Sequence, residues 1–117
     1  LDIIYLLAPT STPARIKQVT EHSSGFIYLV SVAGVTGTRV ALPATLTNFV
    51  SDVRRVTKKP LCVGFGISTT RQANQVAQIA DGVIVGSKII QLVEGDTSFS
   101  RVADFIKQMR KAIDTSR

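Results

Sequence analysis

The sequence has few of the residues that build disulfide scaffolds, stacking surfaces or metal centres. Among 117 residues there are one cysteine, one histidine and no tryptophan, and aromatic residues make up 6%. A single cysteine excludes an intrachain disulfide and favours a reducing compartment. Because Cys62 lies inside an apolar run, we interpret it as a buried structural thiol. We expect no metal site in this chain.

Long apolar runs and targeting signals are also missing. No apolar stretch approaches the roughly 20 residues that a membrane-spanning helix needs, so we expect no membrane partner. The chain starts at Leu1 with neither Met nor a basic stretch, which predicts no signal peptide and a segment cut from a longer polypeptide. With 44% hydrophobic and 19% charged residues, the sequence is too apolar for a disordered chain. We expect one small domain over residues 1–117.

Positive charge is in excess but is not gathered into one site. The chain has 14 Lys and Arg against 8 Asp and Glu, a net charge of +6. These basic residues are scattered over expected helix surfaces, and no aromatic residues alternate with them as a base-stacking platform requires. We therefore expect solvated helix faces and no nucleic-acid partner. The excess is compatible with a small anionic substrate.

Apolar strands and amphipathic helices alternate along the chain. Expected strands cover residues 3–7, 26–30, 61–63 and 83–85. Expected helices run from Pro13 to about 23, onward from Pro43, from a cap at Thr69 or Thr70 to about 80, and over 88–93 behind a cap at Ser87. A last helix buries Phe99, Val102, Ile106, Met109 and Ile113, which are spaced by threes and fours. Nearly continuous apolar strands separated by helices predict a parallel sheet covered by helices.

Two α/β architectures fit this order, an open doubly wound sheet and a (β/α)₈ TIM barrel. A full barrel takes roughly 250 residues, so four strand–helix units are half of one. The short extra helix at 88–93 favours the barrel. Barrel enzymes often bind phosphate with the loops after the last two strands and the N-terminus of such a helix. We predict the last four βα units of a TIM barrel, a half barrel.

Glycine-bearing loops follow three of the expected strands, at residues 31–37, 64–68 and 86–87. Glycine lets the backbone turn tightly and approach a ligand closely. Backbone N–H groups at a helix N-terminus hold phosphate well, because the helix dipole favours negative charge there. We therefore predict phosphate contacts from Gly66, Gly86 and Ser87, with Gly37 contributing from the neighbouring loop. Tight turns alone explain any single glycine, but not two adjacent loops followed by a short helix.

Acid–base chemistry has no evident residues at this face. None of the eight carboxylates follows an expected strand, and Asp2 and Asp81 precede strands instead. Arg39 and Lys88 are the basic residues near the expected ligand face. Lys88 can either screen phosphate or lie solvated on its helix. A general acid or base must lie within hydrogen-bond reach of the substrate, so we expect no catalytic pair among these residues.

Four segments resemble the tryptophan synthase α subunit family: LAPTSTP at 7–13, YLVSVAGVTG at 28–37, VGFGIS at 63–68 and ADGVIVGS at 80–87. They occur in order and span nearly the whole chain. The resemblance implies a TIM-barrel lyase of tryptophan biosynthesis that cleaves indole-3-glycerol phosphate by a retro-aldol reaction to indole and glyceraldehyde 3-phosphate. It also implies a partner β subunit that receives the indole and carries pyridoxal phosphate, with no cofactor in this chain.

The resemblance further implies roles for single residues. Those expected to bind the glycerol phosphate are Gly37, Phe65, Gly66, Gly86 and Ser87. Tyr28 and Ile84 would line the pocket, residues 33–37 would form a mobile loop over it, and Thr36 would help position a catalytic aspartate. The family's catalytic glutamate and aspartate belong to earlier strands that this sequence does not contain. We therefore expect no lyase activity from these residues alone.

Other functions remain open at this point. A stand-alone indole-3-glycerol-phosphate lyase would share every motif. Another phosphate-binding barrel, such as an isomerase of histidine or tryptophan biosynthesis, would share the phosphate site, and a non-catalytic phosphate-binding half barrel is the third reading. The half barrel leaves two open parallel sheet edges, so we expect either self-association or an N-terminal complement that covers these edges. We expect a cytoplasmic protein, or one of the plastid stroma in a photosynthetic eukaryote.

Overall fold

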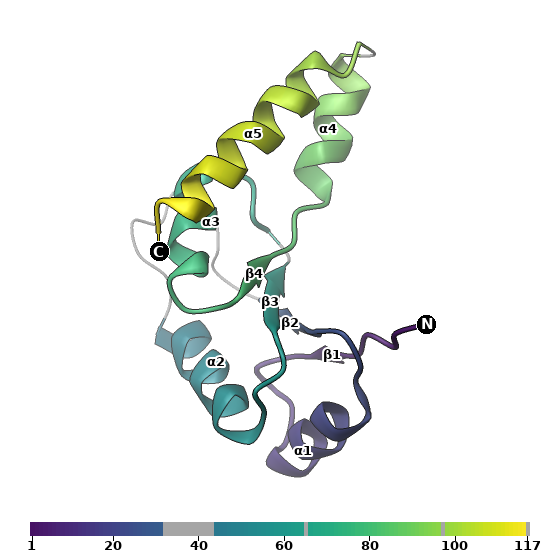
Figure 1. The fold of residues 1–117 in the computed structure, drawn as a ribbon, viewed down its shortest axis with the longest axis vertical. Helices are drawn as coiled ribbons and strands as arrows, with labels where there is room; N and C mark the ends of the chain where they lie inside the picture. Colours follow the sequence, from purple (N-terminus) through teal and green to yellow (C-terminus); the bar gives the residue numbers. More distant parts are fainter. Residues whose placement is uncertain (32–43, 65, 97, 117) are drawn as a thin grey trace.

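Four parallel strands in sequence order, β1-β2-β3-β4, form the sheet at the centre of the molecule (Figure 1). The structure is a computed structural model that describes residues 1–31, 44–64, 66–96 and 98–116. Its elements are β1 (Leu6–Leu7), α1 (Pro13–His22), β2 (Ile27–Val30), α2 (Ala44–Val56), β3 (Leu61–Gly64), α3 (Thr70–Ala77), β4 (Gly82–Val83), α4 (Ser87–Gly95) and α5 (Ser100–Asp114). The expected alternation of strands and helices is confirmed, while Pro43 lies outside the described residues.

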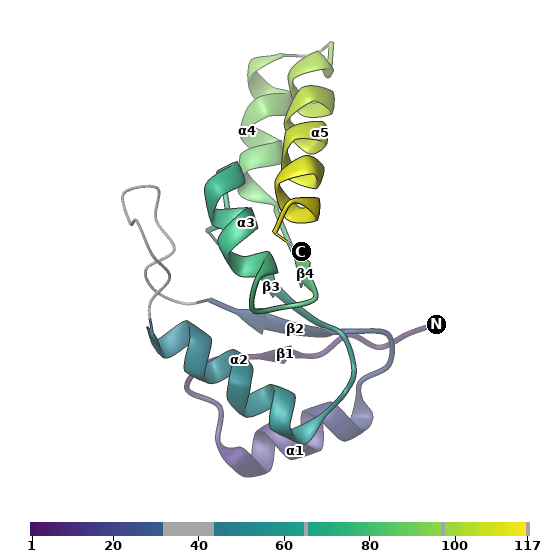
Figure 2. The same ribbon diagram turned by 60° about the vertical axis from the view of Figure 1, so that its left-hand side comes forward.

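The hydrophobic core lies on one face of this sheet. Five strand side chains are each at most 1% exposed: Leu7, Ile27, Leu29, Leu61 and Val63. They pack with apolar side chains of α1, α2 and α3, and Figure 2 shows α1 and α2 together on one side of β1 and β2. Successive strand side chains point to opposite faces, so the residues between these five belong to the second face.

That second face is much less covered. Leu6 is 58% exposed, and Tyr28 and Cys62 are half-buried. The prediction of a buried Cys62 thiol is therefore wrong, because its side chain is half-buried on the face that the helices leave open. Burial, with a smaller contribution from the nearby Asp81 carboxylate, still raises the pKa of the Cys62 thiol. The thiol thus stays protonated near neutral pH and is a poor nucleophile.

Local signals in the sequence fix the helix starts. The Thr12 hydroxyl accepts a hydrogen bond from the Arg15 N–H at 3.2 Å, and Pro13 takes the first position of α1. Thr69 rather than Thr70 is the N-cap of α3, in a capping box with Gln72. The prediction that Ser87 caps α4 is wrong by one residue: Gly86 is the N-cap, and Ser87 is the first helical residue.

The elements at the two sheet edges differ most from expectation. β1 and β4 have two residues each, shorter than predicted, because each has a hydrogen-bonded neighbour strand on one side only among the described residues.

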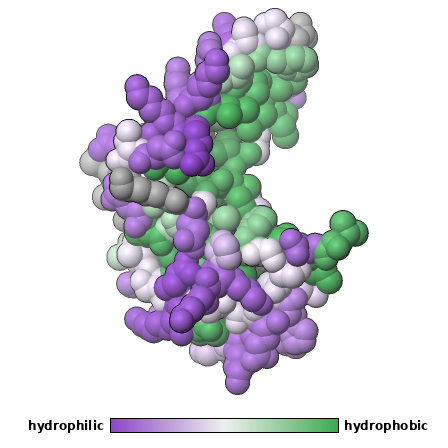
Figure 3. All heavy atoms as spheres, viewed as in Figure 1, coloured by the Kyte–Doolittle hydropathy of each residue, from purple (hydrophilic) through white to green (hydrophobic). Residues whose placement is uncertain are grey.

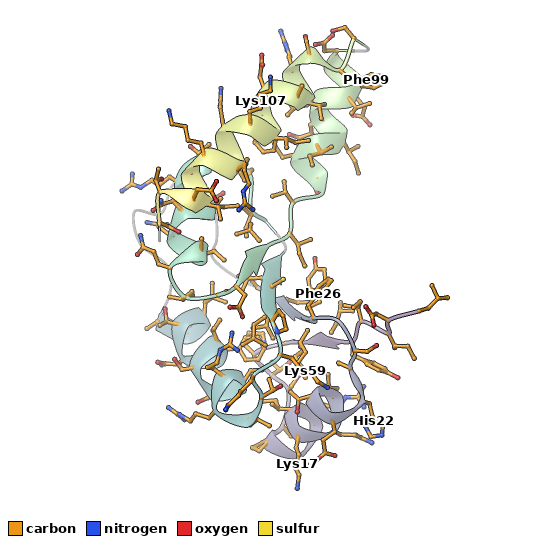
Figure 4. The ribbon with its side chains drawn as sticks, viewed as in Figure 1. Lys17, His22, Phe26, Lys59, Phe99 and Lys107 are labelled. Atoms are coloured by element: carbon orange, nitrogen blue, oxygen red, sulfur yellow. The ribbon has the colours of Figure 1, made fainter. Side chains whose placement is uncertain are left out.

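The last helix is also less covered than its pattern predicted. Of the apolar stripe on α5, only Met109 is buried, while Ile106 is 51% exposed. Phe99 is 57% exposed at the start of α5, near the tip of the α4–α5 hairpin (Figure 4). Figure 3 shows apolar side chains along the hollowed side of the molecule, between this hairpin and the N-terminal end.

Polar contacts of loop residues hold the amino ends of the strands. The Lys59 ammonium donates to the Thr20 and Ser23 carbonyls at 2.6 Å each and so ties the loop before β3 to the end of α1 (Figure 4). Asp81, just before β4, accepts a hydrogen bond from the Leu61 N–H at 2.9 Å and pairs with the Arg54 guanidinium. The carboxylate therefore links α2, β3 and β4.

Replacing Asp81 with alanine is expected to lower the free energy of unfolding by about 1–3 kcal/mol, because the part-buried Leu61 N–H loses its acceptor. Asp52→Ala is the matched control, since the Asp52 side chain is 55% exposed and, among the ion pairs of the described residues, its carboxylate pairs only with the exposed Arg55. That loss is expected to cost less than about 0.5 kcal/mol. Urea denaturation of both variants measures the difference, and equal effects would contradict the structural role of Asp81.

Candidate functional site

A cavity of about 370 Å³ opens where the loops after β3 and β4 meet β2. Its lining comprises Tyr28, Gly66, Ile67, Ser68, Ile84, Gly86, Ser87, Lys88 and Gln91. Five of the residues predicted from the sequence are therefore brought together, although they come from three different parts of the chain. Thr36, Gly37 and Phe65, with the rest of the loop at 33–37, lie outside the described residues. The cavity faces the side expected for ligands in a parallel αβ structure.

Gly64, at the end of β3, allows Tyr28 and Ile84, which line the cavity, to pack against the strand backbone. A Cβ atom at this position would lie 2.5 Å from the Tyr28 hydroxyl oxygen and 2.9 Å from the Ile84 Cβ. Real Cβ atoms do not approach other heavy atoms so closely, so only glycine allows both side chains to lie against this backbone. Nothing in the sequence gave Gly64 this role. The available signal was a glycine in the last position of an otherwise apolar strand.

The loop from β3 to α3 turns at Gly66, whose φ of +85° belongs to the left-handed region that favours glycine. After this turn Ile67 enters the core and Ser68 lines the cavity. The Gln72 carboxamide oxygen accepts hydrogen bonds from the Ser68 N–H at 2.8 Å and the Thr69 N–H at 3.1 Å. Gln72 and Thr69 therefore provide side-chain acceptors at the N-terminus of α3. Gln72 has no predicted role, yet the Thr-x-x-Gln spacing of a capping box was readable in the sequence.

The N-terminus of α4, in contrast to that of α3, has no side-chain cap. Its N-cap is Gly86, which has no side chain to cap the helix, and the first turn holds no acidic residue. The Ile90 N–H makes the first helical bond, to the Gly86 carbonyl at 3.2 Å. The N–H groups of Ser87, Lys88 and Ile89 therefore have no intrahelical acceptor. Such groups, with the positive end of the helix dipole, bind anions.

The charge of the lining also suits an anion. Lys88 is half-buried and is the one cationic side chain that the described residues place in the lining. None of the eight carboxylates, all of which the structure describes, lines the cavity. Tyr28 is the other titratable residue in the lining. The arrangement can hold a phosphate group, but the described residues bring no carboxylate or imidazole to it for proton transfer.

A larger cavity, of about 730 Å³, lies between α1 and α2. Asp52 and Arg55, which form an ion pair with each other, are among its lining residues. No residue singled out from the sequence as a site residue lines it, and it opens among helices instead of against the loops after β3 and β4. We therefore place the chemistry at the smaller cavity.

Within the described ranges, no three His, Cys, Asp or Glu residues come together as a metal site would require. The same part of the chain contains no helix with the length and apolar character needed to cross a membrane.

Comparisons with known proteins agree on one family. The family model described as "Tryptophan synthase alpha chain" matches residues 1–115. The tryptophan synthase alpha chain of Dehalococcoides mccartyi is 58% identical over 114 residues, which are 97% of this chain and 45% of that protein. The corresponding chain of Gloeobacter violaceus is 44% identical, with 98% of this chain and 43% of that protein covered. The chain therefore spans less than half the length of these relatives, and it matches their C-terminal part.

Solved structures give the same result at the level of the fold. A tryptophan synthase structure from Mycobacterium tuberculosis superposes with a TM-score of 0.84 at 37% identity, covering 97% of this chain and 42% of the other. Tryptophan synthase subunit alpha from Campylobacter jejuni gives a TM-score of 0.71 at 32% identity, covering 97% and 42%. These relatives are TIM barrels, and the four-stranded parallel sheet with its helices corresponds to half of such a barrel. The chain belongs to the tryptophan synthase alpha chain family.

Proposed function

We propose that the polypeptide carrying this chain is the lyase of the tryptophan synthase α reaction, and that residues 1–117 form the domain half that holds the substrate phosphate. The reaction cleaves indole-3-glycerol phosphate to indole and glyceraldehyde 3-phosphate. The observation that carries the proposal is the cavity itself: the uncapped N-terminus of α4 and one lysine belong to its lining, and no carboxylate does. Family membership supplies the substrate class.

In this proposal the backbone N–H groups at the start of α4 and the Ser87 hydroxyl hold the phosphate oxygens. Gly66 brings the backbone of the neighbouring loop close to the same group. Tyr28 and Ile84 form the wall against which the rest of the substrate lies. The cavity volume of about 370 Å³ is at the small end of the range for ligand sites, which fits one part of a larger substrate pocket.

Cleavage itself needs groups that this cavity does not show. A retro-aldol step requires a base to take the proton of the glycerol hydroxyl beside the breaking bond. It also requires an acid to protonate the ring carbon that receives the electron pair. Because no carboxylate lines the cavity, we assign both roles to residues of the whole protein outside this segment.

Replacing Ser87 with aspartate is expected to weaken binding of glycerol phosphate at least about 30-fold, because a fixed negative charge then occupies the first position of α4. The helix itself is expected to stay intact, since an acidic residue suits a helix N-terminus. Calorimetry on the intact natural polypeptide measures the affinity. Ala14→Asp is the control, because it adds the same charge to the first turn of α1, away from the cavity. Unchanged affinity in Ser87→Asp would contradict the phosphate site.

The partner proposals follow from the family. We propose a cytoplasmic protein whose product indole passes to a tryptophan synthase β subunit. The α-chain family has no cofactor of its own, and pyridoxal phosphate belongs to the β subunit. Copurification with a β subunit distinguishes this function from a stand-alone lyase. Self-association of the segment through its open sheet edges is a further proposal, which sedimentation of residues 1–117 tests.

A non-catalytic phosphate-binding module is the second candidate, and the absence of carboxylates from the cavity favours it. The two candidates differ in turnover. If the intact natural polypeptide binds glycerol phosphate but forms no indole from indole-3-glycerol phosphate, with or without a β subunit, the module is the correct function.

A further inference from the structure

Lys88 occupies an unusual position for a lysine. It is the second residue of α4, it is one of the residues that line the cavity, and it is half-buried. No hydrogen bond or ion pair joins its ammonium group to another described residue. Lysine is favourable in the last turn of a helix, where it meets the negative end of the dipole, and unfavourable in the first turn.

Two groups therefore make the electrostatic potential of one cavity positive. The open N–H groups of Ser87, Lys88 and Ile89 present the positive end of α4, and the Lys88 ammonium adds a full charge. The first turn of α4 has no acidic residue, and no carboxylate lines the cavity. Among the described residues no carboxylate of the lining balances this positive charge. An anion in the cavity would therefore interact favourably with both the helix dipole and the lysine.

The two contributions act differently on a ligand. Backbone N–H groups and the Ser87 hydroxyl are neutral donors, which bind the oxygens of a singly or doubly charged group in similar geometry. A full charge interacts about twice as strongly with a dianion as with a monoanion at the same distance. The lysine therefore distinguishes ligands by charge, whereas the helix N-terminus recognises their shape.

We propose that Lys88 is a specificity-determining residue of this site, which makes the cavity select doubly charged phosphate monoesters over singly charged esters of the same shape. The proposal rests on the phosphate site proposed above. It also predicts a conflict between stability and binding. Removing the lysine relieves unfavourable electrostatics in the free protein and weakens the complex.

The test compares Lys88→Met with Lys107→Met in the intact natural polypeptide. Lys107 is exposed on α5 and does not line the cavity, so it controls for the loss of one net charge (Figure 4). Calorimetry measures the binding of glycerol phosphate, a dianion at pH 8, and of glycerol sulfate, a monoanion. Thermal unfolding of the ligand-free proteins is recorded in parallel.

Lys88→Met is expected to weaken glycerol phosphate binding roughly 4- to 16-fold and glycerol sulfate binding only about 2- to 4-fold. Its ligand-free unfolding temperature is expected to stay equal or rise, and its glycerol phosphate affinity should depend less on salt. Lys88→Arg is expected to restore the discrimination, while Lys107→Met should match the wild type. Equal losses for both ligands, or no loss, overturn the role of Lys88 while leaving the phosphate site in place. If the wild type binds neither ligand, the phosphate site fails as well.

Discussion

Residues 1–117, expressed alone, are expected to bind glycerol phosphate but to release no indole from indole-3-glycerol phosphate. None of the eight carboxylates lines the cavity, and the single histidine, His22, lies at the end of α1 instead. General acid–base catalysis by one positioned group typically contributes 10²–10⁴-fold, and the retro-aldol step needs both an acid and a base. We therefore expect the rate of indole formation to fall at least about 10⁴-fold below that of the intact natural polypeptide.

This result requires evidence that the segment is folded. Circular dichroism should show its helices, and calorimetry with glycerol phosphate should show that the cavity has formed. The intact natural polypeptide, assayed in the same buffer, is the positive control for indole formation. Indole release by the folded segment would contradict the placement of the acid and base elsewhere. A folded segment that binds no glycerol phosphate would contradict the placement of the phosphate site here.

Gly64→Ala is expected to damage the site strongly, because two residues of the cavity lining, Tyr28 and Ile84, pack against Gly64. The new Cβ would lie 2.5 Å from the Tyr28 hydroxyl oxygen and 2.9 Å from the Ile84 Cβ, so both cavity walls must move. Misplacing binding groups by about 1 Å can cost 10²-fold, and we expect substrate turnover in the intact natural polypeptide to fall at least about 30-fold. Overpacking should also lower the free energy of unfolding by about 1–3 kcal/mol.

Gly95→Ala provides the matched control for Gly64→Ala. A Cβ at Gly95 would meet nothing within 4 Å, and this residue lies at the end of α4. The control is expected to be neutral or to stabilise the helix by up to about 1 kcal/mol. Adding Tyr28→Phe to Gly64→Ala removes the hydroxyl contact but leaves the contacts with the ring carbon Cζ at 2.8 Å and with Ile84, so recovery should be small. Wild-type affinity and stability in Gly64→Ala would show that the wall adapts freely.

The sequence predicted most of the order of elements, because that order depends on local signals. Alternating apolar and polar segments identified the strands and helices, and Thr12, Pro13 and Thr69 marked the helix starts. Each of these signals acts within one turn of helix or a few residues of strand. The positions of Gly66, Gly86 and Ser87 around one cavity also followed from the strand ends, since parallel strands bring their carboxyl ends to one edge. Tyr28 and Ile84 were expected there from the family resemblance alone.

Other features depend on residues that are distant in the sequence. The apolar stripe of α5 predicted burial, but Ile106 is exposed because burial depends on what covers a face and not on its periodicity. The role of Gly64 requires β2 and the segment after β4 to pack against β3. The lining position of Lys88 requires α4 to begin beside the β3–α3 loop.

The sequence by itself therefore determined the N-caps of α1 and α3, the alternation of strands and helices and the residues at the strand ends, because local backbone and side-chain preferences set them. Only the tertiary structure decided which sheet face stays uncovered, that Tyr28 and Ile84 pack against Gly64, and that Lys88 belongs to the cavity lining. These features depend on packing between segments that are distant in the sequence.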